Sequence, residues 1–298
     1  MKGDNPFVVW GEKPQNIYGR KEEIKLFNTY LNAILSRQPV GIAVKGGRGA
    51  GKSIFLERLI AEAEKKGFFC VLIKVAKGES RESLLGKLRA GSEAAASTMA
   101  AEGKLKKGAY EKLGKASWKD AASFFLTAKK IVCPPFYGVM VFLDDVDNTK
   151  TDIAGFFRDG IVKVSRKGSF SAVVSSKKKR NGFFREIELR PFSIEEAEEL
   201  VKKTTGKTTP RLGSECVKTI FRESGGNPQL FKLACWYLYE KLKDKAKVIT
   251  KGHYLAYLPA MISFLAAEVF ERMYSEVPEG EREVLTESAL PLLPRATP

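Results

Sequence analysis

Histidine is almost absent from this chain of 298 residues, in which His253 is the single example. The sequence therefore offers almost no residues for catalysis by histidine or for metal centres rich in histidine. Cysteine is also scarce. Its four positions are scattered, without the C-x-x-C spacing of zinc or redox sites, and we expect free, buried thiols rather than disulfides or a metal site. They are Cys70, Cys133, Cys216 and Cys235.

Long apolar runs are missing as well. No run approaches the roughly 18 residues that a bilayer-spanning helix requires. The N-terminal stretch "MKGDNPFVVWGEKP" contains no hydrophobic segment of signal-peptide length. The sequence therefore predicts a cytoplasmic protein that does not associate with a membrane.

Acidic residues are outnumbered by basic ones, 35 against 51, which gives a formal net charge of +16. An excess of this size suits a polyanionic partner, and nucleic acid is the first candidate. A lysine-rich surface that serves solubility or heat tolerance is the alternative, and composition alone leaves both open.

The first two thirds of the chain alternate between apolar runs and helical patterns. Continuous apolar strands separated by helices predict a parallel sheet that is covered on both faces, hence an α/β fold. The expected strands are 40–45, 68–75, 138–145, 170–176 and 184–192. The expected helices are 52–67, 79–100, 117–130 and 152–165.

After Pro191 the pattern becomes helical throughout. "SIEEAEELVKKTTG" (193–206) starts with a serine followed three residues later by glutamate, which is the sequence of a capping box. We therefore expect a sheet domain over 1–191, a small α-helical lid domain over 192–250 and a helical extension over 251–298.

The stretch "KGGRGAGKS" (45–53) matches the phosphate-binding pattern G-x-x-x-x-G-K-[ST] and lies between an expected strand and an expected helix. Its glycines let backbone N–H groups surround phosphates at the positive end of the helix. Lys52 is expected to reach the β- and γ-phosphates, and the Ser53 hydroxyl to coordinate magnesium. The residues expected against the nucleotide are Gly46, Gly47, Arg48, Gly49, Ala50, Gly51, Lys52, Ser53 and Ile54.

The partner of this loop is "VMVFLDDVDN", a hydrophobic strand that ends in aspartates. A carboxylate at the end of such a strand lies beside the magnesium ion of a nucleotide site. We assign Asp144 to magnesium and Asp145 to polarising the attacking water, whereas Asp147 is expected to be a surface cap. The expected cofactors are ATP and Mg²⁺.

Four further stretches resemble one group of proteins. "NIYGRKEEIKLF" (16–27) is similar to the GR-x-x-E box of AAA+ and STAND ATPases, and "AVVSS" resembles their sensor-1 strand. "ELRPFSIEEAEEL" resembles the junction into a helical lid, and "ESGGNPQLFKLA" the lid motif of archaeal STAND-type ATPases and origin-recognition initiators. The chain therefore resembles an AAA+/STAND-type P-loop ATPase over about residues 14 to 245.

This resemblance implies a Mg-dependent ATPase with a P-loop NTPase fold. It places Ile17 and Tyr18 at the adenine base, and Ser175 at the γ-phosphate as a catalytic sensor. Pro228 stands where typical AAA+ proteins carry a sensor-2 arginine, which favours the STAND side. Most relatives have glutamate at the position of Asp145, so the shorter aspartate implies slow hydrolysis or a bridging water.

Two segments are rich in lysine. "GKLKKGAYEKLGKASWK" (103–119) includes Tyr110 and Trp118, which would offer stacking surfaces beside phosphate-binding charges. The alternative is a solvated lysine face with its aromatic residues turned to the core. "SSKKKRNG" (175–182) is either a second contact or a charged exposed turn. Candidate DNA contacts are Lys104, Lys106, Lys107, Lys112, Lys115, Lys178, Lys179 and Arg180.

Two functions follow from these observations. The first is an ATPase that acts on or with DNA, in replication, transposition or the maintenance of a mobile element. The alternative is a nucleotide-dependent switch that controls protein assembly without binding DNA directly. A homo-oligomer or an unknown protein partner is compatible with either.

Overall fold

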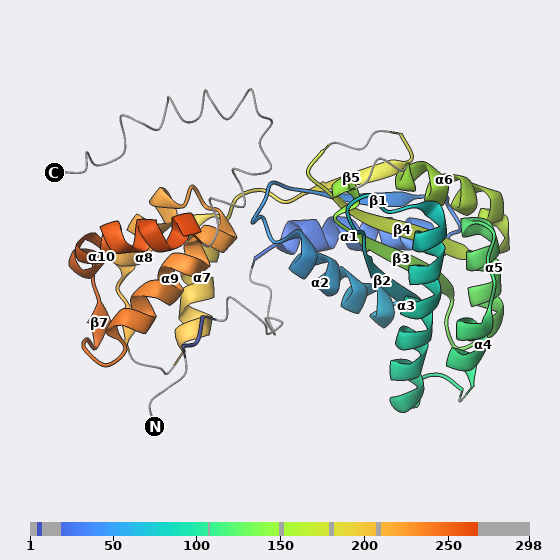
Figure 1. Cartoon of the computed structure of the whole chain (residues 1–298), viewed down its shortest axis with the longest axis horizontal. Coiled ribbons are helices and arrows are strands. Elements are labelled where there is room, and N and C mark those ends of the chain that lie inside the picture. The colour runs from blue at the N-terminus through green and yellow to red at the C-terminus, as the bar shows by residue number, and fades with distance from the viewer. Residues whose placement is uncertain are drawn as a thin grey trace. The chain divides into compact units, whose positions relative to one another are not determined.

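The computed structural model describes residues 5–7, 19–106, 108–148, 152–178, 182–206 and 210–267. The chain forms two compact units, drawn in Figure 1. The sheet unit is Lys13–Pro191, and the helical unit combines Phe192–Pro298 with Met1–Glu12. The contacts thus group residues 5–7 with the part of the chain that follows Pro191.

A parallel sheet forms the centre of the sheet unit. In the described residues it has five strands in the order β2-β3-β4-β1-β5, and every neighbouring pair is parallel. The strands are β1 (Gly41–Lys45), β2 (Phe68–Lys74), β3 (Gly138–Asp144), β4 (Ser169–Ser176) and β5 (Phe184–Glu188). All residues of β3 and β4 are buried, because helices cover both faces of these central strands. The α/β prediction and the five strands are confirmed.

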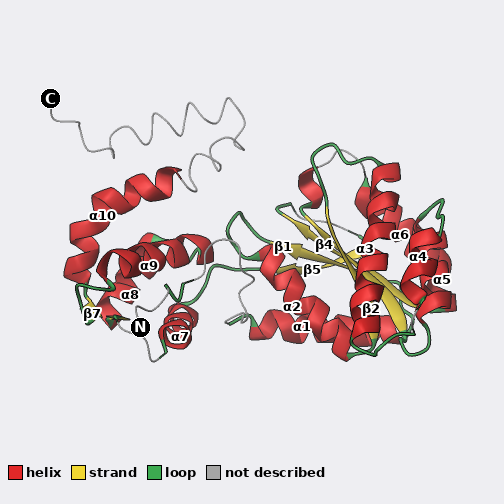
Figure 2. Cartoon of the chain, turned by 60° about the horizontal axis from the view of Figure 1, so that its bottom comes forward, coloured by secondary structure: helices red, strands yellow, loops and turns green. Residues whose placement is uncertain are grey.

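Of the helices that the structure describes in this unit, two pack on one face of the sheet and four on the other, as can be followed in Figure 2. α1 (Lys21–Leu35) and α2 (Lys52–Lys65) bury Phe27, Leu31, Phe55 and Leu59 against the first face. The second face carries α3 (Arg81–Ala101), α4 (Ala109–Lys115), α5 (Ala121–Val132) and α6 (Ile153–Val164). The pattern predicted neither α1 nor α4.

Short 3₁₀ turns lie in the described connections of the sheet unit, and α3 and α5 are among its helices that begin with a side-chain cap. The turns are η1 (Val146–Asn148), directly after β3, and η2 (Ser165–Lys167), directly before β4. α3 is preceded by Ser80, whose hydroxyl accepts a hydrogen bond from the Ser83 N–H, and α5 begins in a capping box formed by Asp120 and Ser123.

The helical unit has its own core. It contains α7 (Ile194–Thr205), β6 (Arg211–Leu212), α8 (Ser214–Glu223), α9 (Pro228–Leu242), β7 (Val248–Ile249) and α10 (Lys251–Leu265). The capping box predicted at the start of α7 is present, with Ser193 and Glu196 bonding each other's backbone N–H. Phe7 is fully buried and its ring meets that of Tyr239 edge to face.

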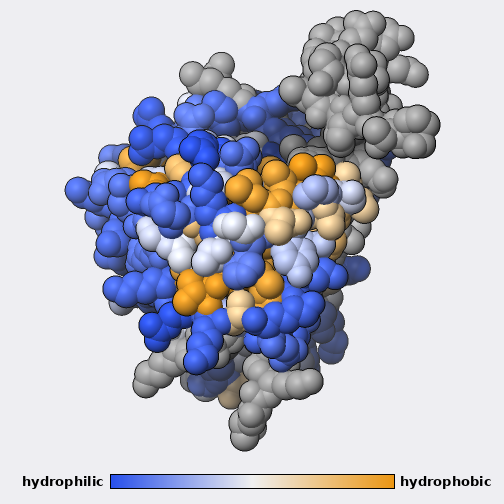
Figure 3. Space-filling model, turned by 90° about the vertical axis from the view of Figure 1, so that its left-hand side faces the viewer, coloured by the Kyte–Doolittle hydropathy of each residue, from blue (hydrophilic) through white to orange (hydrophobic). Residues whose placement is uncertain are grey.

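The surface of the described residues is mostly polar, with a few exposed apolar side chains. Figure 3 shows such side chains gathered on one face of the molecule, and the helical unit exposes Val248, Leu255 and Ile262. All four cysteines are free thiols; Cys70, Cys216 and Cys235 are buried as expected, whereas Cys133 is only half-buried. No helix in the described ranges has the length and apolar character that crossing a membrane would need.

Candidate functional site

The loop between β1 and α2 is built around glycines. Gly49 and Gly51 have φ values of 76° and 88°, in the left-handed region that side chains disfavour. A Cβ at Gly46 would lie 3.0 Å from the Cβ of Ala50, so the loop packs closely at its start. A Cβ at Gly47 or Gly51 would meet nothing within 4 Å. The loop therefore presents backbone to open space, at the positive N-terminus of α2.

Lys52 is the first residue of α2, and its side chain turns back into this loop. Its ammonium group donates hydrogen bonds to the carbonyls of Gly46 at 2.8 Å and Gly47 at 3.0 Å. Burial lowers the pKa of Lys52, while the nearby carboxylate of Asp145 partly opposes this shift. An ammonium has three protons, and these bonds occupy two of them. One proton is left for a further acceptor.

Two neighbouring strands bring acidic and hydroxyl groups to the same end of the sheet. Asp144 ends β3 and is buried, and its Oδ1 accepts a hydrogen bond from the Ser175 hydroxyl at 2.5 Å. The same hydroxyl accepts from the N–H of Asp145 at 2.8 Å. The Gly46 N–H donates to the carbonyl of Ser176 at 3.2 Å, which joins the end of β4 to the start of the loop.

Asp145 leaves the strand in a left-handed conformation, with φ of 59°. Burial raises the pKa of its carboxyl, and the neighbouring charge of Asp144 raises it further. Lys52 acts in the opposite direction. The two carboxylates and the ammonium therefore share one electrostatic environment, although they come from segments that lie far apart in the sequence.

Asp147 is more than the surface cap that the sequence predicted. Its Oδ1 accepts a hydrogen bond from the Ser176 hydroxyl at 2.8 Å, and its Oδ2 accepts one from the Lys177 N–H. It thereby ties η1, which follows β3, to the residues that follow β4. The sequence carried no signal for this bond beyond the run of aspartates.

Arg20 is a second residue whose role the sequence did not reveal. Its side chain is buried and donates to the carbonyl of Arg190 at 2.5 Å and to the carbonyl of Ala50 at 3.4 Å. Glu23 pairs with it at 3.3 Å. Arg20 thus fastens the glycine loop to the segment after β5. The spacing of arginine and glutamate in the GR-x-x-E box is the one signal that could have found this pair.

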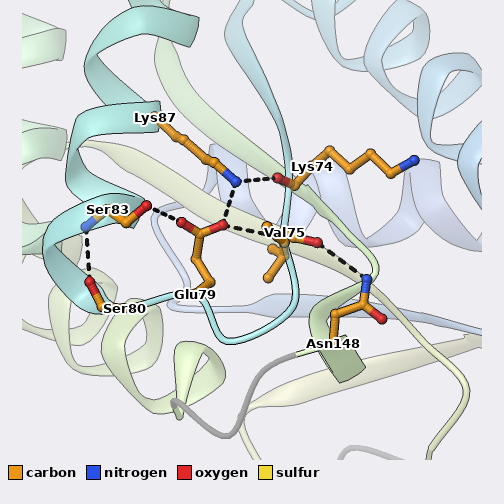
Figure 4. A network of polar contacts seen from close by, with 8 residues as sticks. Lys74, Val75, Glu79, Ser80, Ser83, Lys87 and Asn148 are labelled. Carbon is orange, nitrogen blue, oxygen red and sulfur yellow. Dashed lines mark hydrogen bonds and ion pairs between the residues drawn. The ribbon is translucent and has the colours of Figure 1, made fainter.

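A buried carboxylate holds the loop between β2 and α3 (Figure 4). Glu79 accepts hydrogen bonds from the Ala76 N–H at 2.9 Å and from the side chains of Ser83 and Lys87. Lys87 also donates to the carbonyl of Lys74 at 3.0 Å. Burial alone would raise the pKa of Glu79, but the hydrogen bonds from Lys87, Ser83 and Ala76 together outweigh it and lower the pKa.

The same loop is bonded to the acidic end of β3. Asn148 donates from its side chain to the carbonyl of Val75 at 3.3 Å (Figure 4), and its backbone carbonyl accepts from the Gly78 N–H at 3.1 Å. Its own N–H donates to the carbonyl of Asp145 at 3.1 Å, and the Val75 N–H donates to that of Asp144 at 2.9 Å. Glu79 therefore stabilises the loop on which the acidic residues rest.

The structure brings together one group of predicted site residues. Gly46, Gly47, Lys52, Asp144, Asp145 and Ser175 all lie at the carboxyl end of the sheet. Ser53 is exposed at the start of α2, and Ile54 follows it. Ile17, Tyr18, Lys107, Lys179 and Arg180 lie outside the described residues.

The predicted lid residue Pro228 belongs to the helical unit, where it is the first residue of α9. Gly225 and Gly226 before it are both in the left-handed region, and Asn227 caps the helix by accepting from the Gln229 and Leu230 N–H groups. The "GGNP" sequence therefore forms a helix-start turn, and its role at a nucleotide stays a prediction.

In the lysine-rich segment before α5, the aromatic residues are not placed to stack on bases, as one interpretation of the sequence proposed. Trp118 is 7% exposed and packs edge to face on Phe124, and Tyr110 is half-buried against the same core. Both rings contribute to the hydrophobic core that α4 and α5 cover. The stacking expectation for Trp118 is wrong, whereas Lys112 and Lys115 are exposed as expected.

Lys104 and Lys178, one from each segment, lie at different ends of the sheet unit. Lys104 forms an ion pair with Glu102 at 2.7 Å. Burial raises the pKa of Glu64, in the last turn of α2, and the charge of Lys104 opposes that rise. That turn is about 20 Å from the glycine loop, at roughly 1.5 Å per helical residue. Lys178 follows β4 at the loop end. Lys106 is exposed beside Lys104 in sequence.

Comparison by sequence finds no match, either among models of protein families or among curated proteins. Comparison by structure finds the Holliday junction branch migration motor RuvB of Thermotoga maritima, with a TM-score of 0.51 and 14% identity over 88% of this chain and 77% of that one. Aeropyrum pernix ORC1 in complex with DNA gives 0.53 and 13% over 95% and 75%. Drosophila ORC bound to DNA gives 0.52 and 14% over 93% and 68%.

These likenesses concern the fold. The chain has the fold of an AAA+ P-loop NTPase, with a parallel five-stranded sheet in the described residues, flanking helices and a helical C-terminal region. The predicted fold class is confirmed.

Proposed function

We propose that this protein binds and hydrolyses ATP with Mg²⁺. The observation that carries the proposal is the geometry around Lys52, a buried ammonium that holds a glycine loop at a helix N-terminus beside two strand-end carboxylates. A triphosphate needs a cation, free N–H groups and a magnesium site, and this end of the sheet supplies residues of all three kinds.

The residues present fit the cofactors. The open backbone at Gly47 and Gly51 would hold phosphates, and Lys52 would donate its remaining proton to them. Ser53 and Asp144 would supply oxygen ligands to magnesium, which binds proteins through one or two such groups and the phosphates. Bound magnesium neutralises charge on the phosphates, and Asp145 would orient the attacking water.

The first test is nucleotide affinity. Lys52→Ala removes the cation that contacts phosphate, and loss of a charged hydrogen-bonding group of this kind costs about 1.5 to 3 kcal/mol, roughly ten- to 150-fold in affinity. We expect a loss at the upper end of that range or beyond, measured by isothermal titration calorimetry with ATP and Mg²⁺. Lys65→Ala, in the last turn of α2, is the matched control and should bind normally. Normal affinity of Lys52→Ala would refute the site.

A finer placement among archaeal STAND-type ATPases is part of the same proposal. It is supported by the sequence around Pro228, where a proline occupies the position of a sensor-2 arginine. The cap formed by Asn227 is compatible with this placement, because proline is favoured at the first position of a helix.

We propose further that the protein acts on or with DNA in the cytoplasm, in replication, transposition or mobile-element maintenance. The net charge of +16 and the exposed lysines of α4 support this function. The RuvB and ORC structures of similar fold include proteins bound to DNA. The buried Trp118 argues that charge, rather than stacking, would dominate the contact.

DNA binding should weaken steeply with salt, because each lysine–phosphate contact releases counterions. The double variant Lys112→Gln, Lys115→Gln should lower the slope of log K against log salt by about 0.9 for each phosphate that these lysines neutralise. Fluorescence anisotropy with duplex and single-stranded DNA, with and without ATP, measures this. Lys218→Gln on α8 serves as the control. Absence of binding by the unmodified protein at low salt would contradict the proposal.

The second candidate function is a nucleotide-dependent switch that controls assembly with further copies or with a protein partner. The burial of Trp118 favours it, since the lysine-rich segment then has no described aromatic ring fully available for bases. ATP-dependent change in molecular mass by light scattering, combined with absence of DNA binding, would support this candidate over the first.

A further inference from the structure

Lys177, a residue that the predicted site did not include, directly follows β4. Ser176, the last residue of that strand, is opposite Lys45 of β1, and its carbonyl accepts from the Gly46 N–H at 3.2 Å. Lys177 is therefore attached to the strand that borders the start of the glycine loop. Its side chain is exposed.

The backbone of Lys177 is held on both sides. Its N–H donates to Oδ2 of Asp147, and Oδ1 of the same carboxylate accepts from the Ser176 hydroxyl at 2.8 Å. That hydroxyl lies 2.9 Å from the carbonyl of Lys178 and 3.0 Å from its N–H. The turn over 176–178 is thus fixed around one buried serine. Lys177 extends from a rigid base, although its four-carbon stem can reorient.

The charge of Lys177 reaches the centre of the site. Burial is the main cause of the lowered pKa of Lys52, and repulsion from Lys177 lowers it further. Burial and Asp144 raise the pKa of Asp145, and Lys177 is among the cations that oppose this. Lys177 therefore acts on both the ammonium and the carboxylate of the proposed nucleotide site.

A triphosphate bound in this site would be stabilised by a second cation in addition to Lys52. Lys52 gives two of its three protons to loop carbonyls and keeps one for a phosphate. A triphosphate bound there would bring several negative charges close to Asp144, Asp145 and Asp147. The ammonium of an exposed lysine at the end of β4 can compensate the outermost of these charges.

We propose that Lys177 is a second phosphate-binding residue of this site, which contacts the terminal phosphate of a nucleoside triphosphate and is positioned by Asp147. This inference rests on the proposed function. The inference assigns this role to Lys177 and not to Lys178, the next lysine of the same run. The backbone of Lys178 forms hydrogen bonds with the Ser176 hydroxyl in the turn.

The test compares a triphosphate with a diphosphate. Lys177→Met keeps the apolar stem and removes the charge, and Lys178→Met is the matched control one residue away. Dissociation constants are measured by calorimetry for the non-hydrolysable analogue adenylyl-imidodiphosphate and for ADP, both with Mg²⁺. Circular dichroism verifies that each variant is folded, as expected for substitutions of exposed side chains.

We expect Lys177→Met to weaken binding of the triphosphate analogue on the order of tenfold, as for one charge-assisted contact, and to change ADP binding less than about twofold. Lys178→Met should change neither. Equal losses for both nucleotides, no loss for either, or the same loss in Lys178→Met would overturn the inference. A loss of DNA binding alone in both variants would also overturn it.

Asp147→Asn tests the positioning role by the sign of its effect. Removal of a negative charge near an anion site should tighten binding by electrostatics alone. If Asp147 positions Lys177, the triphosphate analogue should instead bind more weakly, and ADP should not. Tighter binding would refute positioning by Asp147.

Failure of this inference differs from failure of the proposed function. If Lys52→Ala abolishes nucleotide binding while Lys177→Met keeps the preference for triphosphate, the nucleotide site stands and Lys177 has no part in it. If the unmodified protein binds neither nucleotide, the proposed function itself fails.

Discussion

The hydroxyl of Ser175 joins the two carboxyl-bearing residues of the site. It donates to Asp144 and accepts from the N–H of Asp145. A serine hydroxyl has one proton, so Ser175 can donate to a phosphate only if it releases Asp144. The predicted sensor therefore begins in contact with the predicted magnesium ligand, and one contact has to be exchanged for the other.

Asp145 is the residue whose removal should separate binding from hydrolysis. Asp145→Asn keeps the size of the side chain but cannot take up a proton, and loss of a general base typically costs 10²- to 10⁴-fold in rate, so we expect a fall of about that size. ATP affinity should change less than about threefold, well below the tenfold that 1.4 kcal/mol represents. Phosphate release assays and calorimetry measure the two quantities.

The control for this prediction is Asp159→Asn, an exposed aspartate on α6 that pairs with Arg158. It should hydrolyse ATP like the unmodified protein. Normal hydrolysis by Asp145→Asn would show that another residue polarises the water.

At the scale of elements, the loop between β2 and α3 depends on Glu79. Its carboxylate accepts hydrogen bonds from the Ala76 N–H and from the side chains of Ser83 and Lys87 and is nearly fully buried, so Glu79→Gln leaves charged or polar partners poorly satisfied. We expect a loss of about 1 to 3 kcal/mol in the free energy of unfolding. Chemical denaturation measures it, and Glu111→Gln on the exposed side of α4 is the control.

The contribution of Glu79 to the free energy of unfolding should depend on pH. Its pKa in the folded protein is lowered below the ordinary value of 4.5. The ionised carboxylate therefore stabilises the fold above that value, and the stabilisation is lost as the pH falls through the folded pKa. The stability difference between the unmodified protein and Glu79→Gln should shrink below about pH 4.5. A difference that grows towards acid would contradict this account.

Elements with a strong local pattern could be predicted from the sequence. The strands β1, β2 and β3 are largely apolar runs, and the capping box at Ser193 needs two residues three apart, so both were visible. α4 was missed because it has seven residues, too few for an amphipathic pattern, and starts after a left-handed Gly108.

The site was predictable where one short segment carries it. The glycine loop and the strand ending in Asp144 are local patterns. By contrast, Arg20 meets Ala50 and Arg190, and Asp147 meets Lys177, only because the chain folds. Trp118 was ambiguous because an aromatic residue among lysines suits both a core and a nucleic-acid surface, and packing against Phe124 decided for the core.

At the scale of the whole molecule, ATP should stabilise the protein by mass action. A ligand that binds only the folded state adds about 2.7 kcal/mol at a concentration 100 times its dissociation constant. We expect a higher midpoint of thermal unfolding with ATP and Mg²⁺ in differential scanning fluorimetry. Lys52→Ala should lose this shift, while Lys65→Ala should keep it. An equal shift in Lys52→Ala would mean that ATP binds elsewhere.

The order of the strands bears on how the protein is made. β1 comes first in the chain but lies between β4 and β5, where Ile42 pairs with Val173 and Gly41 with Phe184. During synthesis, both edges of β1 therefore stay unpaired until β4 and β5 have been made. Such non-local pairing is slow, and unpaired strand edges promote aggregation. A chain interrupted before β4 would contain the complete glycine-loop sequence but no binding site, so ATP could not rescue it from degradation.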